Sequence, residues 1–165
     1  MAKIQRIAPC LWFDNHAEEA AKFYVGIFKN SKITAISRYS KAGFEIHRRP
    51  EGSVMTVLFK LEGQSFTALN GGPIFKFSEA ISFQIDCDTQ AEVDHYWDKL
   101  SAGGDPSAQQ CGWLKDKFGL SWQVVPKALP RLLSDPDSAK AGRVMTAMLK
   151  MKKIDIAELE KAGAG

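Results

Sequence analysis

The sequence predicts an α+β fold made of two similar units of strands and one helix each, followed by a set of helices. Residues 14–18 and 88–92 are similar in type and lie roughly 74 residues apart, and an apolar stripe with aromatic residues follows each of them. After Pro126 the chain changes character and carries apolar residues, including methionines, at helical spacing. Neither copy has enough apolar area to be stable alone, so we expect the two to share a core.

The composition fits a small globular protein of 165 residues, with 45% hydrophobic and 25% charged residues. A net charge of +3 is mild and gives no reason to expect a nucleic-acid partner. No apolar run of about 18 residues is present, so no membrane partner is expected. The N-terminus lacks the apolar core of a signal peptide. Cys10, Cys87 and Cys111 are odd in number and widely spaced, which favours reduced thiols and a cytoplasmic location.

The first unit is expected to begin with a mostly buried strand and a helix that starts at a capping box formed by Asn15 and Glu18. Apolar residues then recur at helical spacing as far as Phe28. The predicted strands span residues 4–13, 32–39, 54–61 and 65–70. Residues 41–52 are polar and contain glycine and proline, so we predict a loop that is long enough to cover a site.

The second unit repeats this order with a strand at residues 79–86 and a capping box from Thr89 to Glu92. Residues 111–126 are expected to form two short strands joined by a turn at residues 116–119, where Gly119 permits a positive φ. In the second of these strands Leu120, Trp122 and Val124 share one face, and Ser121, Gln123 and Val125 share the other.

The tail is predicted to be helical. Residues 128–133 suit a short helix, Pro136 fits the first turn of another, and residues 154–162 suit a last one. The methionine-rich stripe between them favours a core or a dimer contact.

Several segments resemble a known family. They are residues 70–73, 81–86, 93–97, 112–119, 121–126 and 143–155. Together they resemble the PhnB-like branch of the vicinal oxygen chelate superfamily, whose members are often named 3-demethylubiquinone-9 3-methyltransferase-like and which also contains glyoxalase I and bleomycin-resistance proteins. The resemblance extends over nearly the whole chain. It implies paired βαβββ modules at residues 1–72 and 73–126, a C-terminal helical extension at residues 127–165, a cavity between curved sheets, and a homodimer.

Metal-dependent members of the superfamily use His, Glu or Gln ligands from corresponding strands of both modules. The resemblance puts these positions at Ile7, Ile81, Gln123 and one of Thr67, Ala68 or Asn70. Isoleucines and neutral amides are poor ligands for a hard cation, so we expect no metal and no cofactor. His16, His47 and His95 are read as surface or core-edge residues.

The methyltransferase name has little support in the sequence. The usual S-adenosylmethionine enzymes have a glycine-rich loop after the first strand. Residues 13–16 contain no glycine, and Gly71 and Gly72 follow a hairpin strand instead of opening a helix. We therefore expect the name to be a misnomer, while another mode of cofactor binding stays open.

Two functions remain in competition. One is a protein that binds a small aromatic or planar molecule, and the other is an enzyme of the same superfamily, of the lyase, isomerase or oxygenase type. The candidate ligand-binding residues are Gln123, Trp113, Asn70, Phe83, Trp12 and Asp116. For several of them a structural reading is also open, because Asp116 suits the turn and Trp113 suits a core.

Overall fold

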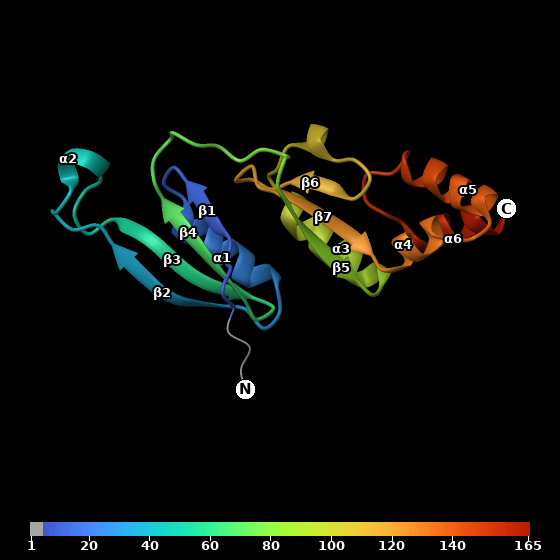
Figure 1. Ribbon diagram of the computed structural model, residues 1–165, viewed down its shortest axis with the longest axis horizontal. Coiled ribbons are helices and arrows are strands. Elements are labelled where there is room, and N and C mark those ends of the chain that lie inside the picture. Colours follow the sequence, from blue (N-terminus) through green and yellow to red (C-terminus); the bar gives the residue numbers. More distant parts are fainter. Residues whose placement is uncertain (1–4) are drawn as a thin grey trace. The chain divides into compact units, whose positions relative to one another are not determined.

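The computed structural model describes residues 5–165, and the chain divides into two compact units. The first ends at Lys76 and the second spans Phe77–Gly165 (Figure 1). Each is described here by itself. No helix among the described residues combines the length and the apolar character that crossing a bilayer requires.

The first unit is a four-stranded sheet with one long helix on one face. Its elements are β1 (Cys10–Phe13), α1 (Ala17–Ile27), β2 (Lys32–Arg38), α2 (Phe44–His47), β3 (Val54–Leu61) and β4 (Gln64–Asn70). The strand order is β1-β4-β3-β2, with β1 parallel to β4 and the other pairs antiparallel. Tyr24 of α1 stacks on Phe59 of β3, with ring centroids 6.3 Å apart, and both side chains are fully buried. The core of this unit therefore lies between α1 and the sheet.

The second unit has the same plan but one strand fewer among the described residues. Its first elements are β5 (Ser82–Cys87), α3 (Gln90–Ser101), the 3-10 helix η1 (Pro106–Ala108), β6 (Trp113–Lys115) and β7 (Ser121–Pro126). The strand order is β5-β7-β6, with β5 parallel to β7. Where the first unit has β2, this unit has η1 and a single bridge between Gln110 and Trp113. Val93, Trp97 and Leu100 of α3 are buried and cover one face of the sheet.

The tail forms three helices within the second unit, α4 (Ala128–Leu133), α5 (Ser138–Met148) and α6 (Ile156–Ala164). They share a small core in which Leu129, Val144, Ile154 and Leu159 are buried. Val125 of β7 packs against this core, so the tail is joined to the sheet by apolar contacts.

The segment between α5 and α6 is also hydrogen-bonded to the second unit. Cys111 and Gly112 donate their N–H groups to the carbonyl oxygens of Met151 and Lys152, at 2.9 and 2.8 Å. Gln90 of α3 receives a hydrogen bond from the N–H of Ile156 at 2.9 Å and donates one to the carbonyl of Ile154 at 3.1 Å. Gly112 has a φ of +83°, and a Cβ there would lie 2.8 Å from the carbonyl oxygen of Val124, so only glycine fits.

The predicted bounds of helices and strands agree best with the structure where an element contacts its neighbours in the sequence. The strand at residues 54–61 and the helix at 128–133 are confirmed. The first strand begins only at Cys10, because Pro9 has no N–H to donate; of the residues predicted for it, Ile4 lies outside the described part. Residues 41–52 contain the short α2, and β5 begins at Ser82. In the tail, α5 starts after Asp137, whose carboxylate accepts from Ala139 N–H at 3.0 Å, so Pro136 lies just outside it.

The two helix starts differ from each other. Thr89 caps α3 as predicted, with Oγ1 3.2 Å from the N–H of Glu92, while the Glu92 carboxylate accepts from Asp88 N–H at 2.7 Å. The capping box at Asn15 and Glu18 is wrong, because α1 starts after His16 with no side-chain cap from that residue.

Candidate functional site

Eight side chains of the strands lie on the face of the second sheet opposite α3, and two of them, Asp86 and Val125, lie at one end of it. We call the other six the polar face: Ser82, Gln84, Trp113, Lys115, Ser121 and Gln123. The alternate residues of the same strands, such as Ile85 and Val124, are buried on the α3 side. The polar face is therefore the side of this sheet that offers hydrogen-bonding groups.

Gln123 and Trp113 form the centre of the polar face. They are directly opposite each other in the pairing of β7 with β6, and both are half-buried. The Nε2 of Gln123 donates to Ser82 Oγ at 2.9 Å. No group in residues 5–165 donates to the carbonyl oxygen of this amide. An aromatic ring and an available acceptor thus lie side by side.

Ser121 and Lys115 lie one row away from that pair. Ser82, Ser121 and Lys115 are aligned across β5, β7 and β6. Ser121 is 1% exposed, and its Oγ has no hydrogen-bond partner among the described residues. The Lys115 ammonium pairs with the carboxylate of Glu79, and the hydrogen bond from Lys115 lowers the pKa of Glu79.

Asp116 and Phe83 do not reach the polar face. The Asp116 carboxylate is buried and accepts from Phe118 N–H at 2.8 Å, Leu120 N–H at 3.1 Å and Trp122 Nε1 at 2.9 Å. These three hydrogen bonds to the Asp116 carboxylate shape the turn between β6 and β7. Phe83 lies on the α3 side against Trp122, with ring centroids 5.6 Å apart.

Trp12 and Asn70 belong to the first unit and are engaged within it. Trp12 donates its Nε1 to the carbonyl of Gly72 at 2.8 Å, and its ring contacts Phe75 edge-on at 4.9 Å. A Cβ on Gly71 would lie 2.1 Å from this ring, so the indole packs directly on the glycine backbone. Asn70 is buried; its Oδ1 accepts from Ala17 N–H at 2.8 Å and its Nδ2 donates to Val54 O at 3.1 Å.

The residues at the superfamily's metal positions do not fit a divalent cation. Ile7 and Ile81 have no donor atoms, and their side chains are 88% and 70% exposed. The Asn70 oxygen already accepts from the start of α1. Among residues 5–165, no three His, Cys, Asp or Glu side chains are grouped as a metal site requires.

The other reactive side chains are poorly placed for catalysis. Burial, with smaller contributions from Glu92, Asp86 and Asp88, raises the pKa of the Cys87 thiol to about 12. Burial also raises the pKa of Cys10. Both shifts disfavour the thiolate, which is the nucleophilic form. The His47 ring contacts the Tyr39 ring at a tilt, with centroids 4.5 Å apart, and its Nδ1 accepts from Arg49 N–H at 2.9 Å.

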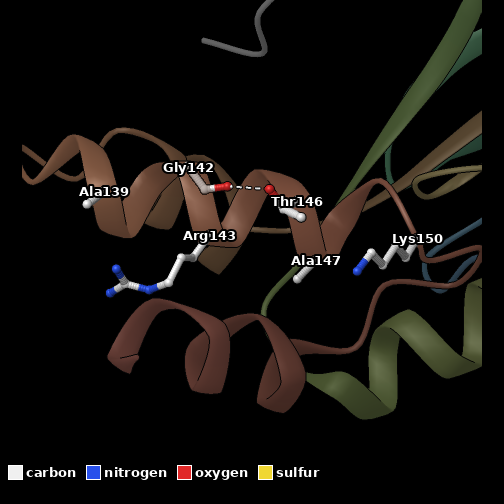
Figure 2. A pocket seen from close by; sticks show the side chains of 6 residues that line it. All are labelled: Ala139, Gly142, Arg143, Thr146, Ala147 and Lys150. Carbon is white, nitrogen blue, oxygen red and sulfur yellow. Dashed lines mark hydrogen bonds between the residues drawn. The ribbon is translucent and has the colours of Figure 1, made fainter.

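A hollow on the tail is a weaker candidate (Figure 2). Its volume is about 550 Å³, and every residue that lines it belongs to α5 or the turn after it. Its lining residues are Ala139, Gly142, Arg143, Thr146, Ala147 and Lys150. Arg143 donates to the carbonyls of Ala162 and Gly163, and Thr146 donates to the carbonyl of Gly142 at 2.9 Å. These polar groups are used within the tail.

The sequence analysis named both Gln123 and Trp113 as candidate site residues, but it did not name Ser121, Lys115 or Glu79 as such. The alternation of β7 already put Ser121 on the face of Gln123. The register with β5 and β6, which aligns Ser82 and Lys115 with it, has no signal within either segment alone.

Comparison with known proteins identifies the family. The profile described as 3-demethylubiquinone-9 3-methyltransferase matches residues 5–125. The chain belongs to that family. A PhnB protein from Bacillus cereus that bears the same methyltransferase name is 36% identical, with a TM-score of 0.63 over 74% of this chain and 99% of that one. A search of curated proteins found no match.

More distant structures show the fold alone. A protein from Pseudomonas aeruginosa is 20% identical, with a TM-score of 0.56 over 74% of this chain and 98% of that one. The fosfomycin resistance protein FosX from Mesorhizobium loti is 12% identical, with a TM-score of 0.50 over 75% and 90%. The chain thus has the vicinal oxygen chelate fold that the resemblance implied.

The tail lies outside the family profile. The family profile ends at residue 125, before α4 begins at Ala128. The Bacillus cereus protein is covered almost completely by 74% of this chain. The expectation that the resemblance extends over nearly the whole chain is therefore corrected: the three tail helices lie outside the part that the family profile matches.

Proposed function

We propose that this family member binds a small planar molecule on the polar face of its second sheet, with no metal at the superfamily positions. The observation that carries the proposal is the register of Trp113 opposite Gln123. A half-buried indole supplies stacking area, and the amide oxygen supplies a directed acceptor. The Ser82 hydroxyl, which accepts from Gln123 Nε2, fixes the amide in that orientation.

The sequence also assigns ligand contacts to Trp12, Asn70, Phe83 and Asp116. We propose that Phe83 and Asp116 act indirectly, since they hold Trp122 and the turn between β6 and β7 in place. Asn70 supports the first unit in the same indirect way. Trp12 stays a prediction from the sequence, and its ring lies on the face of the first sheet opposite α1.

Titration with benzamide, a neutral planar probe, tests this proposal. Calorimetry is expected to show saturable binding that weakens about three- to tenfold in Trp113→Ala and about two- to tenfold in Gln123→Ala. Gln64→Ala is the matched control, because Gln64 is exposed at the start of β4 in the first unit. Equal benzamide affinity in all four proteins, or no saturable binding, would contradict the proposal. Circular dichroism establishes that each variant is folded.

Metal analysis tests the other half of the proposal. The purified chain is expected to lose divalent ions on gel filtration without chelator, since the isoleucines at the superfamily positions offer no ligand atoms. A stoichiometric ion that is retained, and that is released by Gln123→Ala, would overturn it.

A methyltransferase is the second candidate, and the family description is the observation that favours it. Binding of S-adenosylmethionine is the discriminating measurement. The chain after β1, from Asp14 to His16, contains no glycine, and Gly72 follows β4 instead of preceding a helix. We therefore expect no calorimetric signal, and micromolar binding of S-adenosylmethionine would replace the first proposal with the second.

We also propose a cytoplasmic homodimer, which rests on the superfamily resemblance and on the free thiols Cys10, Cys87 and Cys111. Light scattering is expected to give twice the 18.3 kDa chain mass. A mass of one chain at every concentration would contradict it.

A further inference from the structure

The ion pair between Lys115 and Glu79 has an unusual path. Lys115 lies on β6, Glu79 precedes β5, and β7 runs between these two strands. Neighbouring strands are about 4.8 Å apart, so the backbone of Lys115 is roughly 10 Å from β5. A lysine and a glutamate side chain span that gap only together. The ion pair therefore joins β6 to the segment that leads into β5.

The residue of β7 beside Lys115 is Ser121, because Ser82, Ser121 and Lys115 share one row of the register. Lys115 and Ser121 point to the same face as a directly opposed pair. Ser121 is 1% exposed although it lies opposite the face that α3 covers. Its hydroxyl has no hydrogen-bond partner among the described residues.

We propose that Glu79 is an internal stand-in for the carboxylate of a ligand. A bound carboxylate displaces Glu79 from the Lys115 ammonium and also accepts a hydrogen bond from Ser121 Oγ. This inference rests on the proposed function, because it places the rest of the ligand on Trp113 and Gln123.

The exchange is energetically reasonable for both partners. The Glu79 side chain is 63% exposed, so its carboxylate returns to water easily, and exposed ion pairs contribute little. A buried hydroxyl without a partner is unfavourable, and a ligand oxygen at Ser121 removes that penalty. The Ser82 hydroxyl accepts from Gln123 and still has its own proton to donate. One carboxylate can therefore meet an ammonium and two hydroxyl groups.

The spacing of the two rows indicates the class of ligand. The Trp113–Gln123 row lies two residues along the strands from the Lys115–Ser121 row, a separation of roughly 7 Å. A carboxylate attached directly to a flat ring bridges that separation, with the ring on Trp113 and the acid at Lys115. The structure thus favours a small aromatic carboxylic acid.

Benzoate and benzamide, compared by calorimetry at low ionic strength, test the inference. They have the same ring, but only benzoate carries a charge. Glu79→Gln is expected to tighten benzoate about two- to fivefold by removing the internal competitor. Lys115→Met is expected to weaken benzoate about tenfold or more, and Ser121→Ala about three- to tenfold. Benzamide affinity is expected to stay the same in Glu79→Gln and Lys115→Met.

Controls separate this role from effects on folding. Lys99→Met on α3 and Glu160→Gln on α6 change the same charges away from the polar face and are expected to leave benzoate binding unchanged. Glu79→Asp, which shortens the competing side chain, is expected to give a smaller gain than Glu79→Gln. Near-UV circular dichroism monitors the fold.

The outcomes also separate this inference from the proposed function. Benzoate binding that is unaffected by Lys115→Met, or weakened by Glu79→Gln, overturns the stand-in role while benzamide binding to Trp113 and Gln123 survives. Benzoate binding that needs Lys115 but not Trp113 or Gln123 supports the stand-in role and overturns the planar-ligand proposal. Absence of benzoate binding overturns the inference outright.

Discussion

The two units follow the same order of strand, helix and strands, but their helices start in different ways. In the second unit, Thr89 and Glu92 cap α3 from within its own first turn. In the first unit, the cap of α1 comes from Asn70, 53 residues further along the chain, at the end of β4. One fold position is therefore stabilised locally in one copy and by tertiary structure in the other.

The sheets differ in a related way. The first sheet ends at β2, whereas the second has no described strand beside β6 and has η1 there instead. Just before β6, Cys111 and Gly112 are hydrogen-bonded to the tail, so contacts from outside the repeated unit hold the segment that enters this strand. The comparison suggests that the second unit depends on the tail, while the first unit depends on Asn70.

The largest expected effect is on the tail contact. Ile154 is 1% exposed and packs against Gly112, so Ile154→Ala is expected to lower the free energy of unfolding by about 3 kcal/mol. Urea denaturation measures this. Ile46→Ala is the control, since that side chain is 84% exposed and its loss is expected to cost less than about 0.5 kcal/mol. Equal losses in the two variants would mean that the tail does not support the sheet.

The next effect concerns the distant cap. Asn70→Ala removes the acceptor of Ala17 N–H and the donor to Val54 O, both next to buried backbone, so we expect a loss of about 2–3 kcal/mol. Asn15→Ala tests the cap that the sequence suggested and is expected to cost less than about 0.5 kcal/mol. A larger loss of stability for Asn15→Ala than for Asn70→Ala in thermal denaturation would mean that Asn15, and not Asn70, caps α1.

The local cap of α3 is expected to contribute less to the free energy of unfolding than the distant cap of α1. Thr89→Ala removes one acceptor at an exposed helix start and should cost about 1 kcal/mol. Thr34→Ala, an exposed threonine on β2, is a matched substitution outside any helix start. If Thr89→Ala proved as costly as Asn70→Ala by urea denaturation, the contrast between local and distant caps would disappear.

The sequence predicted those features whose causes lie within a few residues. The capping box at Thr89, the strand at residues 54–61 and the alternation that aims Gln123 away from Trp122 all depend on near neighbours. The superfamily resemblance supplied the order of the strands. It did not indicate that η1 would stand beside β6 in place of a strand, or that the tail, which lies beyond the family profile, would bond to Cys111 and Gly112.

The site was harder to predict for the same reason. Asn70 reads as a polar residue at a strand end, yet its partners Ala17 and Val54 come from two other elements. Glu79 and Lys115 are separated in the sequence by β5, α3 and η1, and only the tertiary structure shows that their side chains pair. Polar side chains therefore acquire their roles from pairing that the local sequence does not encode.

The smallest expected effect concerns the ion pair that ties the tail to α3. A hydrogen bond from Lys153, 2.9 Å from the carboxylate, lowers the pKa of Asp94, and a weaker hydrogen bond from Gln90 adds to it. Because the folded pKa lies below the unfolded value, the stabilisation is complete above about pH 4 and is lost as the pH falls through the folded pKa. Both side chains are partly exposed, so we expect only about 0.5 kcal/mol at pH 7.

Thermal denaturation of the natural chain and of Asp94→Asn, at a series of pH values, measures this contribution. The natural chain is expected to melt slightly higher at pH 7, and the difference should vanish once the pH falls below the lowered pKa of Asp94 in the folded state. The same pair raises the pKa of Lys153, so the difference should also shrink above about pH 10.5. A difference that persists unchanged in acid would mean that Asp94 holds the tail through its shape and hydrogen bonds to Gln90, and that its charge contributes nothing.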